Sequence, residues 1–250
     1  RWRRTTETLF ANTCILRPGL VLGETSYGGS SLLRAMAALP LYLPVVGDGQ
    51  QRFNPIHAAD LAEVVAECLD RPTPGIWDIG GPEVITQSDL LSSYRAWLGL
   101  PAAARLHLPI KAAVALGRLG DILRVGPVSA TAVAQLQAGV LAAPEPLLAR
   151  LGTRPRGVSS FLNARPTGTQ DLWHARLYLL KPLIRLTLAA LWLVSGVLGL
   201  ATPAASFVPG LPLPDPLAIA LARGFGLADL ALGIARRAVP NRCDHRLVVL

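Results

Sequence analysis

The stretch TCILRPGLVLG, residues 13–23, decides the fold class of this chain. Residues 14–21 are apolar and β-branched enough to form a buried strand, and Arg17-Pro18-Gly19 bends or ends it. Proline has no backbone N–H, so at the carboxyl end of a strand it ends the hydrogen-bonded ladder. Open α/β sheets bind their ligands at that edge. The stretch therefore predicts a strand whose carboxyl end borders a ligand site.

Strands and helices alternate along the residues that follow, which indicates an α/β segment with parallel pairing. Apolar residues at helical spacing and the breaks at Gly and Pro predict helices over 31–39, 59–69 and 88–98, with extended segments over 41–46, 52–56 and 76–79. Residues 111–123 and 129–141 also have helical character, and prolines interrupt the chain between 144 and 166.

The end of the chain is far more apolar than its beginning. Hydrophobic residues make up 51% of the 250 residues and charged residues only 16%, and the excess lies after Leu177. Residues 186–201 contain no charge, and with 182–185 they reach the ~20 residues that cross a bilayer. A second candidate span is 217–235, and 247–250 has the composition of the start of a third. The alternative is that these segments are long buried helices of a soluble domain.

The net charge of +8 comes from scattered arginines rather than from a basic run with interleaved aromatics, so we expect no nucleic-acid partner. Cationic residues instead flank the apolar segments, which favours membrane spans with cytoplasmic flanks and makes membrane lipid a partner. They are Arg176, Lys181 and Arg185 before the first segment, and Arg236, Arg237, Arg242 and Arg246 after the second.

Two charged residues, Arg223 and Asp229, lie inside the second apolar segment, where ionisable side chains are functional candidates. They are six residues apart, so they do not share a helical face. Each is expected to pair with another helix, or Arg223 reaches the membrane surface along its aliphatic stem.

The cysteines and histidines predict no metal site. Cys14, Cys68 and Cys243 are far apart and form no C-x-x-C pair, which argues against a zinc site or a disulfide framework. His57 and Asp60 precede and begin the predicted 59–69 helix. There the Asp60 carboxylate can cap N–H groups and offset the helix dipole, so a structural role is favoured for both residues over catalysis.

Four motifs occur in order and at regular spacing: LRPGLVLG, SYGGSSLLRAM, GDGQQRFNPIHAADLAEVV and WDIGGPEVITQSDLL. This series resembles the C-terminal half of the short-chain dehydrogenase/reductase superfamily, in its extended and atypical members of the NAD-dependent epimerase/dehydratase type. The later stretch WHARLYLLKPLIRLTLAALWLVSGVLGL, which starts at Trp173, resembles a DoxX-like membrane domain.

These resemblances imply the fold class and the domain limits. Residues 1–125 would be the C-terminal part of a Rossmann-type NAD(P)-binding α/β domain, and 126–172 a helical extension and linker. Residues 173–250 would be a truncated DoxX-like α-helical membrane domain. No initiator Met and no glycine-rich phosphate loop precede the first motif, so the chain is expected to be a piece whose N-terminal half is a missing partner.

The resemblance also implies the site. The cofactor would be NAD or NADP, and no catalytic residue can be named, because residues 1–10 would follow the YxxxK pair of the family. Arg52 would point into the substrate cleft, since its planar fork suits a phosphate or carboxylate, and His57 would shape that cleft. The cofactor-binding residues would be Pro18, Gly19, Leu20 and Val21, and the substrate-binding residues Tyr27, Gly28, Gly29, Arg52 and His57.

The expected function is that of a fragment of a membrane-attached NAD(P)-dependent oxidoreductase acting on a carbonyl or hydroxyl carbon. Its substrate would be a small molecule, with a lipid-soluble one such as a quinone favoured by the location. The location would be a bacterial inner membrane, with the soluble part cytoplasmic. The alternative is a catalytically inactive nucleotide-binding or scaffold module anchored to the membrane.

Overall fold

The computed structural model describes residues 10, 12–26, 28–123, 128–203, 206 and 214–238. The chain divides into two compact units. The first comprises Arg1–Asp121 and Pro127–Tyr178, and the second Ile122–Gly126 and Leu179–Leu250.

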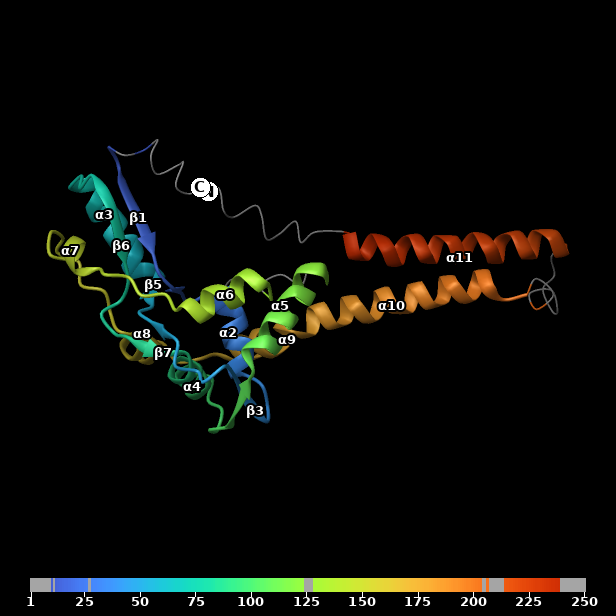
Figure 1. The fold of residues 1–250 in the computed structure, drawn as a ribbon, viewed down its shortest axis with the longest axis horizontal. Helices are drawn as coiled ribbons and strands as arrows, with labels where there is room; N and C mark the ends of the chain where they lie inside the picture. The colour runs from blue at the N-terminus through green and yellow to red at the C-terminus, as the bar shows by residue number, and fades with distance from the viewer. Residues whose placement is uncertain are drawn as a thin grey trace. The chain divides into compact units, whose positions relative to one another are not determined.

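The first unit is an α/β structure (Figure 1). Its strands are β1 (Cys14–Pro18), β2 (Val21–Leu22), β3 (Tyr42–Val46), β4 (Arg52–Phe53), β5 (Ile56–His57), β6 (Gly75–Ile79), β7 (Ile85–Thr86) and β8 (Ala104–Leu108). The helices up to Tyr178 are α2 (Gly29–Ala37), α3 (Ala58–Asp70), α4 (Gln87–Trp97), α5 (Ile110–Leu123), α6 (Ala130–Ala138), α7 (Glu145–Leu148), α8 (Val158–Ala164) and α9 (Thr169–Tyr178).

Among the described strands, three of the four pairs are parallel, which confirms the predicted α/β class. Strand β1 pairs with β6 from Cys14 opposite Gly75 to Pro18 opposite Ile79. Strand β2 pairs with β5, and β3 with β8. Only β4 and β7 run antiparallel among the described strands. Since β1 and β6 run in register, Pro18 and the residues after Ile79 meet at one edge.

Most predicted helices form within one or two residues of their expected ends, and the exceptions have local causes. The last predicted helix of the first unit, 129–141, ends early at Ala138, because Gly139 takes a positive φ of 68° that L-residues avoid. Strand β8 was not predicted. Four of its five side chains are exposed, so its sequence lacks the apolar alternation of a half-buried strand.

The first unit contains two hydrophobic clusters. The larger lies around α4, whose Leu90, Leu91 and Tyr94 are fully buried against β3 and α8. The smaller packs α3 against β6 and α7 through Val64, Ile79 and Leu147.

The segment 126–172, expected as a helical extension and linker, contributes to both clusters. Val158 and Phe161 of α8 belong to the larger cluster, and Leu147 and Leu151 to the smaller. Glu67 of α3 anchors part of this segment by accepting hydrogen bonds from the backbone N–H groups of Gly152 at 2.6 Å and Thr153 at 2.9 Å. The limits of the predicted domains stay a prediction.

The second unit contains α10 (Leu180–Ala201) and α11 (Asp215–Ala238), which lie side by side (Figure 1). Both are long and apolar enough to cross a membrane by length and composition, and only 11% and 17% of their most apolar windows are buried. Glycines allow the close approach: a Cβ at Gly196 would lie 2.8 Å from the Gly226 carbonyl oxygen, and one at Gly233 2.8 Å from Leu193 Cγ.

Arg223 and Asp229 of α11 both find partners on α10 or at its C-terminal end, as the pairing alternative expected. Arg223 donates to the carbonyl oxygens of Gly199, Leu200 and Thr202, where α10 ends and its last carbonyls lack helical partners. Ser195 Oγ donates to Asp229 Oδ2 at 2.6 Å. The expected start of a third span, 247–250, lies outside the described residues.

Candidate functional site

The Pro18-Gly19 turn is tied by backbone hydrogen bonds to two other motif segments. The Gly19 N–H donates to the Ile79 carbonyl at 2.9 Å, and the Ile56 N–H donates to the Leu20 carbonyl at 3.0 Å. The Gly81 N–H donates in turn to the Asn54 carbonyl at 3.0 Å. Three of the four sequence motifs therefore meet at the carboxyl ends of β1 and β6, beside β5.

Asn54 holds a further segment beside this turn. Its side chain is buried, its Nδ2 donates to the Ala142 carbonyl at 2.8 Å, and its Oδ1 accepts from the Ala142 N–H at 2.9 Å. The Val140 N–H donates to the Arg52 carbonyl at 3.1 Å, so 139–142 runs along β4. A Cβ at Gly19 would lie 3.5 Å from Val140 Cγ1. This contact could not be seen in the sequence, because Asn54 and Ala142 are 88 residues apart.

The two glycines after β6, Gly80 and Gly81, allow the hydrogen-bonded segments around the Pro18-Gly19 turn to approach one another closely. A Cβ at Gly80 would lie 2.5 Å from Asn54 Nδ2, and one at Gly81 would collide with the Pro55 carbonyl oxygen. Neither position admits a larger residue without moving the backbone of the FNPIH motif.

His57 caps α3 and is held in one tautomer. Its Nδ1 accepts from the Ala59 N–H at 3.3 Å and from Arg156 Nη2 at 3.1 Å, so the ring proton lies on Nε2. The ring packs on Phe161 with centroids 5.1 Å apart. Burial, reinforced by the nearby Arg156 charge, lowers the pKa of His57 below its ordinary 6.5. The residue is therefore neutral at pH ~7 and can offer only an Nε2–H donor.

Asp60 does not cap α3 as the sequence indicated; His57 does. The Asp60 carboxylate is buried and receives three hydrogen bonds from Arg156, from the backbone N–H at 2.8 Å, Nε at 2.9 Å and Nη2 at 2.6 Å. Burial alone would raise the pKa of Asp60, but these bonds outweigh it and lower the pKa. The expected structural role fits this geometry, with a partner 96 residues away.

The expected substrate mouth at Gly28 and Gly29 has open space in front of it. No atom lies within 4 Å of a Cβ built on either glycine, and Gly28 has a positive φ of 53°. Helix α2 begins at Gly29 without a side-chain hydrogen bond at its N-cap. Tyr27, the third residue expected there, lies outside the described residues.

Helix α9 lies beside this mouth. Tyr178 Oη donates to the Gly28 carbonyl at 3.3 Å, and His174 Nδ1 lies 3.3 Å from Ser26 Oγ. No local pattern in the sequence indicates this contact, because its two sides are about 150 residues apart.

Arg34 of α2 joins the same mouth to the end of β2. The buried guanidinium donates to the carbonyls of Gly23 at 2.5 Å and Glu24 at 3.1 Å. It also lies 3.8 Å from Asp171 of α9 and stacks over Trp97 at 4.9 Å from the ring centroid. This arginine fixes the orientation of α2 and so of Gly28 and Gly29.

The remaining expected residues lie at the same edge. Pro18 is exposed, and Gly19, Leu20 and Val21 are half-buried. Arg52 is exposed on β4, opposite Thr86 of β7. Val140 lies between the expected cofactor residues and Arg52, because it is close to Gly19 and donates its N–H to the Arg52 carbonyl. The pairing of β2 with β5 brings Val21 next to the strand that contains His57.

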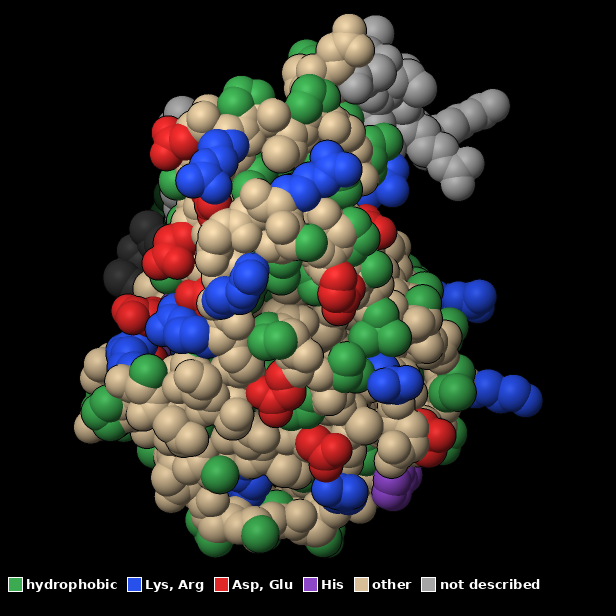
Figure 2. Space-filling model, turned by 90° about the vertical axis from the view of Figure 1, so that its left-hand side faces the viewer, with side chains coloured by type: hydrophobic (Ala, Val, Ile, Leu, Met, Phe, Trp, Pro, Cys, Tyr) green, Lys and Arg blue, Asp and Glu red, His purple; other side chains and the backbone are tan. Residues whose placement is uncertain are grey.

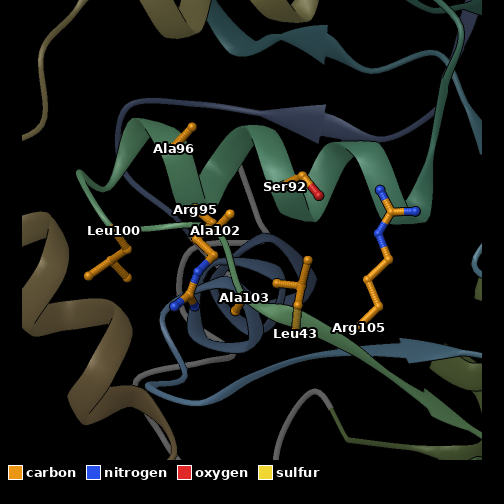
Figure 3. Close-up of a pocket in the computed structure, with 8 residues that line it drawn as sticks. All are labelled: Leu43, Ser92, Arg95, Ala96, Leu100, Ala102, Ala103 and Arg105. Atoms are coloured by element: carbon orange, nitrogen blue, oxygen red, sulfur yellow. The ribbon is translucent and has the colours of Figure 1, made fainter.

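A separate pocket of about 250 Å³ lies between α4, β3 and the start of β8 and contains none of the expected site residues (Figure 3). Its Arg95 donates to the carbonyls of Ala37 and Leu39 at the end of α2 and to Pro101, so this cation has a structural role. The pocket is lined by Leu43, Ser92, Arg95, Ala96, Leu100, Ala102, Ala103 and Arg105.

No group of three metal-ligating side chains occurs in the described parts of the chain. Cys14 and Cys68 are free thiols on either side of the Thr73 hydroxyl, at 3.7 and 3.8 Å, and burial raises the pKa of Cys68. On the face in Figure 2, basic and acidic side chains are interspersed with apolar ones. The expected lack of a nucleic-acid partner stays a prediction.

Comparison with known proteins gives structural neighbours only. No protein-family profile matches the sequence, and no curated protein sequence matches it. A UDP-glucose 4-epimerase from Thermus thermophilus, solved with NAD, is 20% identical over 70% of this chain and 50% of its own, with a TM-score of 0.45. A human epimerase family protein with NADPH is 22% identical over 65% of this chain and 46% of its own, with a TM-score of 0.41.

A third solved structure is an NAD-dependent NDP-hexosamine 5,6-dehydratase of tunicamycin biosynthesis, 20% identical over 65% of this chain and 45% of its own, with a TM-score of 0.41. This chain spans about half of the length of each of these three structures.

Proposed function

We propose that this chain is part of a membrane-attached NAD(P)-dependent oxidoreductase of the short-chain dehydrogenase/reductase type, acting on a carbonyl or hydroxyl carbon of a small molecule. The observation that carries the proposal is the meeting of three sequence motifs at the carboxyl ends of parallel strands. The LRPG, FNPIH and DIGG segments are hydrogen-bonded to one another there. Ligand sites of open α/β sheets lie at this edge.

The proposed cofactor, NAD or NADP, would supply a hydride acceptor or donor next to the Pro18-Gly19 turn. The residues present fit its nicotinamide end, because Pro18 is exposed and has no N–H to pair. Leu20 and Val21 would complete this contact through their backbone. This sequence contains no G-x-G-x-x-G loop for the pyrophosphate, in line with the expected N-terminal half as the part that would hold it.

The proposed substrate site extends from Arg52 to Gly28 and Gly29. Arg52 would hold an anionic group of the substrate, since its guanidinium is exposed and always charged. The start of α2 also favours a negative or oxygen-rich group, because its N-cap residue Gly28 has no side chain to cap the helix and the N-terminus is the positive end of the helix dipole. His57, neutral with Nε2–H, would donate a hydrogen bond rather than a proton.

Membrane attachment through a DoxX-like domain of α10 and α11 is the second part of the proposal. A core helix of a soluble protein is mostly buried, whereas 11% and 17% of these apolar windows are buried. The Arg176, Lys181 and Arg185 cluster would keep the first unit at the cytoplasmic face of a bacterial inner membrane. A lipid-soluble substrate such as a quinone would then be within reach.

The second candidate is a nucleotide-binding or scaffold module without catalysis. It is favoured by one observation: the ionisable groups His57, Asp60 and Arg156 are committed to one another. An enzyme should oxidise NAD(P)H with some member of a panel of ketones, aldehydes and quinones. A module should bind the nucleotide with no turnover.

The substitution Arg52→Ala in the whole protein tests the proposed site. It should raise the substrate KM at least tenfold, since a charge-assisted hydrogen bond contributes about 1.5–3 kcal/mol, and leave the cofactor Kd unchanged. The matched control is Arg105→Ala, an exposed cation paired with Asp89 outside this site. An equal loss of cofactor binding, or a lowered Tm with Arg52→Ala alone, would show that Arg52 is structural.

A further inference from the structure

Helix α5 has two apolar faces, and only one of them is packed. Its inner face consists of small residues, Ala113, Gly117 and Gly120, which are buried. A Cβ at Gly117 would lie 2.9 Å from Ala130 Cα, so the chain before α6 packs directly on the helix backbone. The inner face is therefore complete without any large side chain.

The outer face carries the large side chains. Leu116, Leu119 and Ile122 follow one another at a spacing of three residues, and 50%, 48% and 77% of their surfaces are exposed. Ala112 and Ala115 lie between them on the helix surface and are also exposed. An exposed apolar stripe of this kind marks an interaction surface.

Charge along one edge of this stripe indicates what it contacts. Lys111 and Arg118 lie about two helical turns apart on the same side of the helix and are exposed. The single acidic residue of α5, Asp121, is also exposed, and its Oδ2 accepts the Ala130 N–H at 3.0 Å. An apolar stripe bordered by two cations, with the one carboxylate of the helix engaged by a backbone N–H, is complementary to an anionic lipid surface.

The course of the chain supports the same occupant. The first unit ends at Tyr178, and α10 begins at Leu180. If α10 crosses a bilayer, the chain reaches the membrane surface close to Leu180. Helix α5 has 14 residues, too few to span the hydrocarbon core, so it would lie in the interface.

We infer that α5 is an interfacial helix that places Leu116, Leu119 and Ile122 in an anionic bilayer surface. The inference rests on the proposed membrane attachment. It assigns a second, peripheral contact in addition to the spanning helices.

The test uses the full chain in lipid nanodiscs containing phosphatidylglycerol, with its three cysteines replaced by alanine and one nitroxide label per variant. Leu119→Cys reports on α5, Val194→Cys on α10, and Leu69→Cys on α3 is the matched control. All three native side chains are apolar and exposed, with exposed fractions of 48% for Leu119, 57% for Val194 and 77% for Leu69. Labels at 119 and 194 should be accessible to oxygen, and the label at 69 to a water-soluble nickel chelate.

The outcomes separate the two hypotheses. A water-accessible label at 119 with a lipid-accessible label at 194 overturns the interfacial helix and leaves the membrane attachment standing. Water access at both positions overturns the attachment itself. A label at 119 that neither reagent reaches shows a protein partner or second copy on α5, and lipid access at 69 shows non-specific adsorption; either result overturns the inference.

A charge variant provides the second measurement. Lys111→Gln together with Arg118→Gln should lower the lipid-inserted population at position 119 roughly thirtyfold, because each basic side chain at an anionic surface contributes ~1 kcal/mol. The same variant should have no effect in discs of phosphatidylcholine alone. An unchanged signal in the anionic discs would contradict the proposed role of the two cations.

Discussion

The guanidinium of Arg156 forms an ion pair with the carboxylate of Asp60, 96 residues earlier in the chain, with Nη2 2.6 Å from Oδ1. The same arginine donates its backbone N–H to Oδ2 at 2.8 Å, and its Nη2 lies 3.1 Å from His57 Nδ1. The start of α3 and the connection before α8 are therefore held by one side chain. Because His57 also pairs with the end of β2, this contact controls the shape of the proposed cleft.

Arg156→Ala should destabilise the first unit by about 2–3 kcal/mol, because it leaves the Asp60 carboxylate, 4% exposed, without its cationic partner and with only the backbone N–H of residue 156 as a donor. The measurement is thermal unfolding of the chain in detergent. The control is Arg71→Ala, since Arg71 is 70% exposed in its pair with Glu67 and should matter by less than ~0.5 kcal/mol. Equal effects of the two substitutions would mean that the Asp60 contact adds nothing beyond a surface ion pair.

Stability should fall as pH is lowered from ~7.5 to ~5, in part because of His57. The folded-state pKa of His57 is lowered from 6.5, so the unfolded chain takes up the proton first. The stability that neutral His57 contributes is fully present above the ordinary pKa of 6.5. It is lost as pH falls from that value through the lower pKa of the folded state. His57→Asn keeps an N-cap acceptor and removes the titration, so it should flatten the dependence of Tm on pH. The same slope in both proteins would exclude His57 as its source.

Gly81→Ala should destabilise the first unit by ~2 kcal/mol or more, because the added Cβ meets the Pro55 carbonyl oxygen and forces a backbone shift. Gly29→Ala is the matched control, since a Cβ there meets no atom within 4 Å. Unfolding midpoints of the two variants give the comparison. In the proposed enzyme, Gly81→Ala should also weaken cofactor binding. A stable and fully active variant would contradict the tight contact between Gly81 and the Pro55 carbonyl.

If α10 and α11 form a hairpin across the membrane, a cysteine at Ser206 should react with an impermeant maleimide in intact cells. Residues 202–214, which connect the helices, contain no Lys or Arg, which favours export of this connection. A cysteine at Ser160, an exposed position of α8, should react only after the cells are opened. Protection of both positions in intact cells would contradict this topology.

The sequence predicted the α/β class and most helices because these depend on local patterns. The apolar spacing of 59–69 and the proline after Arg17 are visible in a window of a few residues. The Pro18 edge, the Gly28–Gly29 opening and the position of Arg52 follow from the same motifs. What these residues bind stays a prediction.

The contacts that fix the site could not be predicted, because they join residues 88–150 positions apart. Arg156, Asn54 and Tyr178 carry no local pattern that distinguishes them from other polar residues. Asp60 shows the consequence: helix-start chemistry indicated a carboxylate that caps N–H groups of its own helix, but its partner is an arginine from another part of the chain.

The side-chain amide of Asn54 pairs with both backbone groups of Ala142, so this contact requires the amide to remain chemically intact. Asparagine ages by deamidation, in which the backbone nitrogen of the next residue attacks the side-chain amide. Here the next residue is Pro55, whose ring nitrogen carries no hydrogen and cannot serve as that nucleophile. The sequence Asn-Pro therefore protects the Asn54 amide against deamidation. Conversion of this amide to a carboxylate would place a negative charge against the Ala142 carbonyl. That repulsion would release the segment beside the Pro18-Gly19 turn.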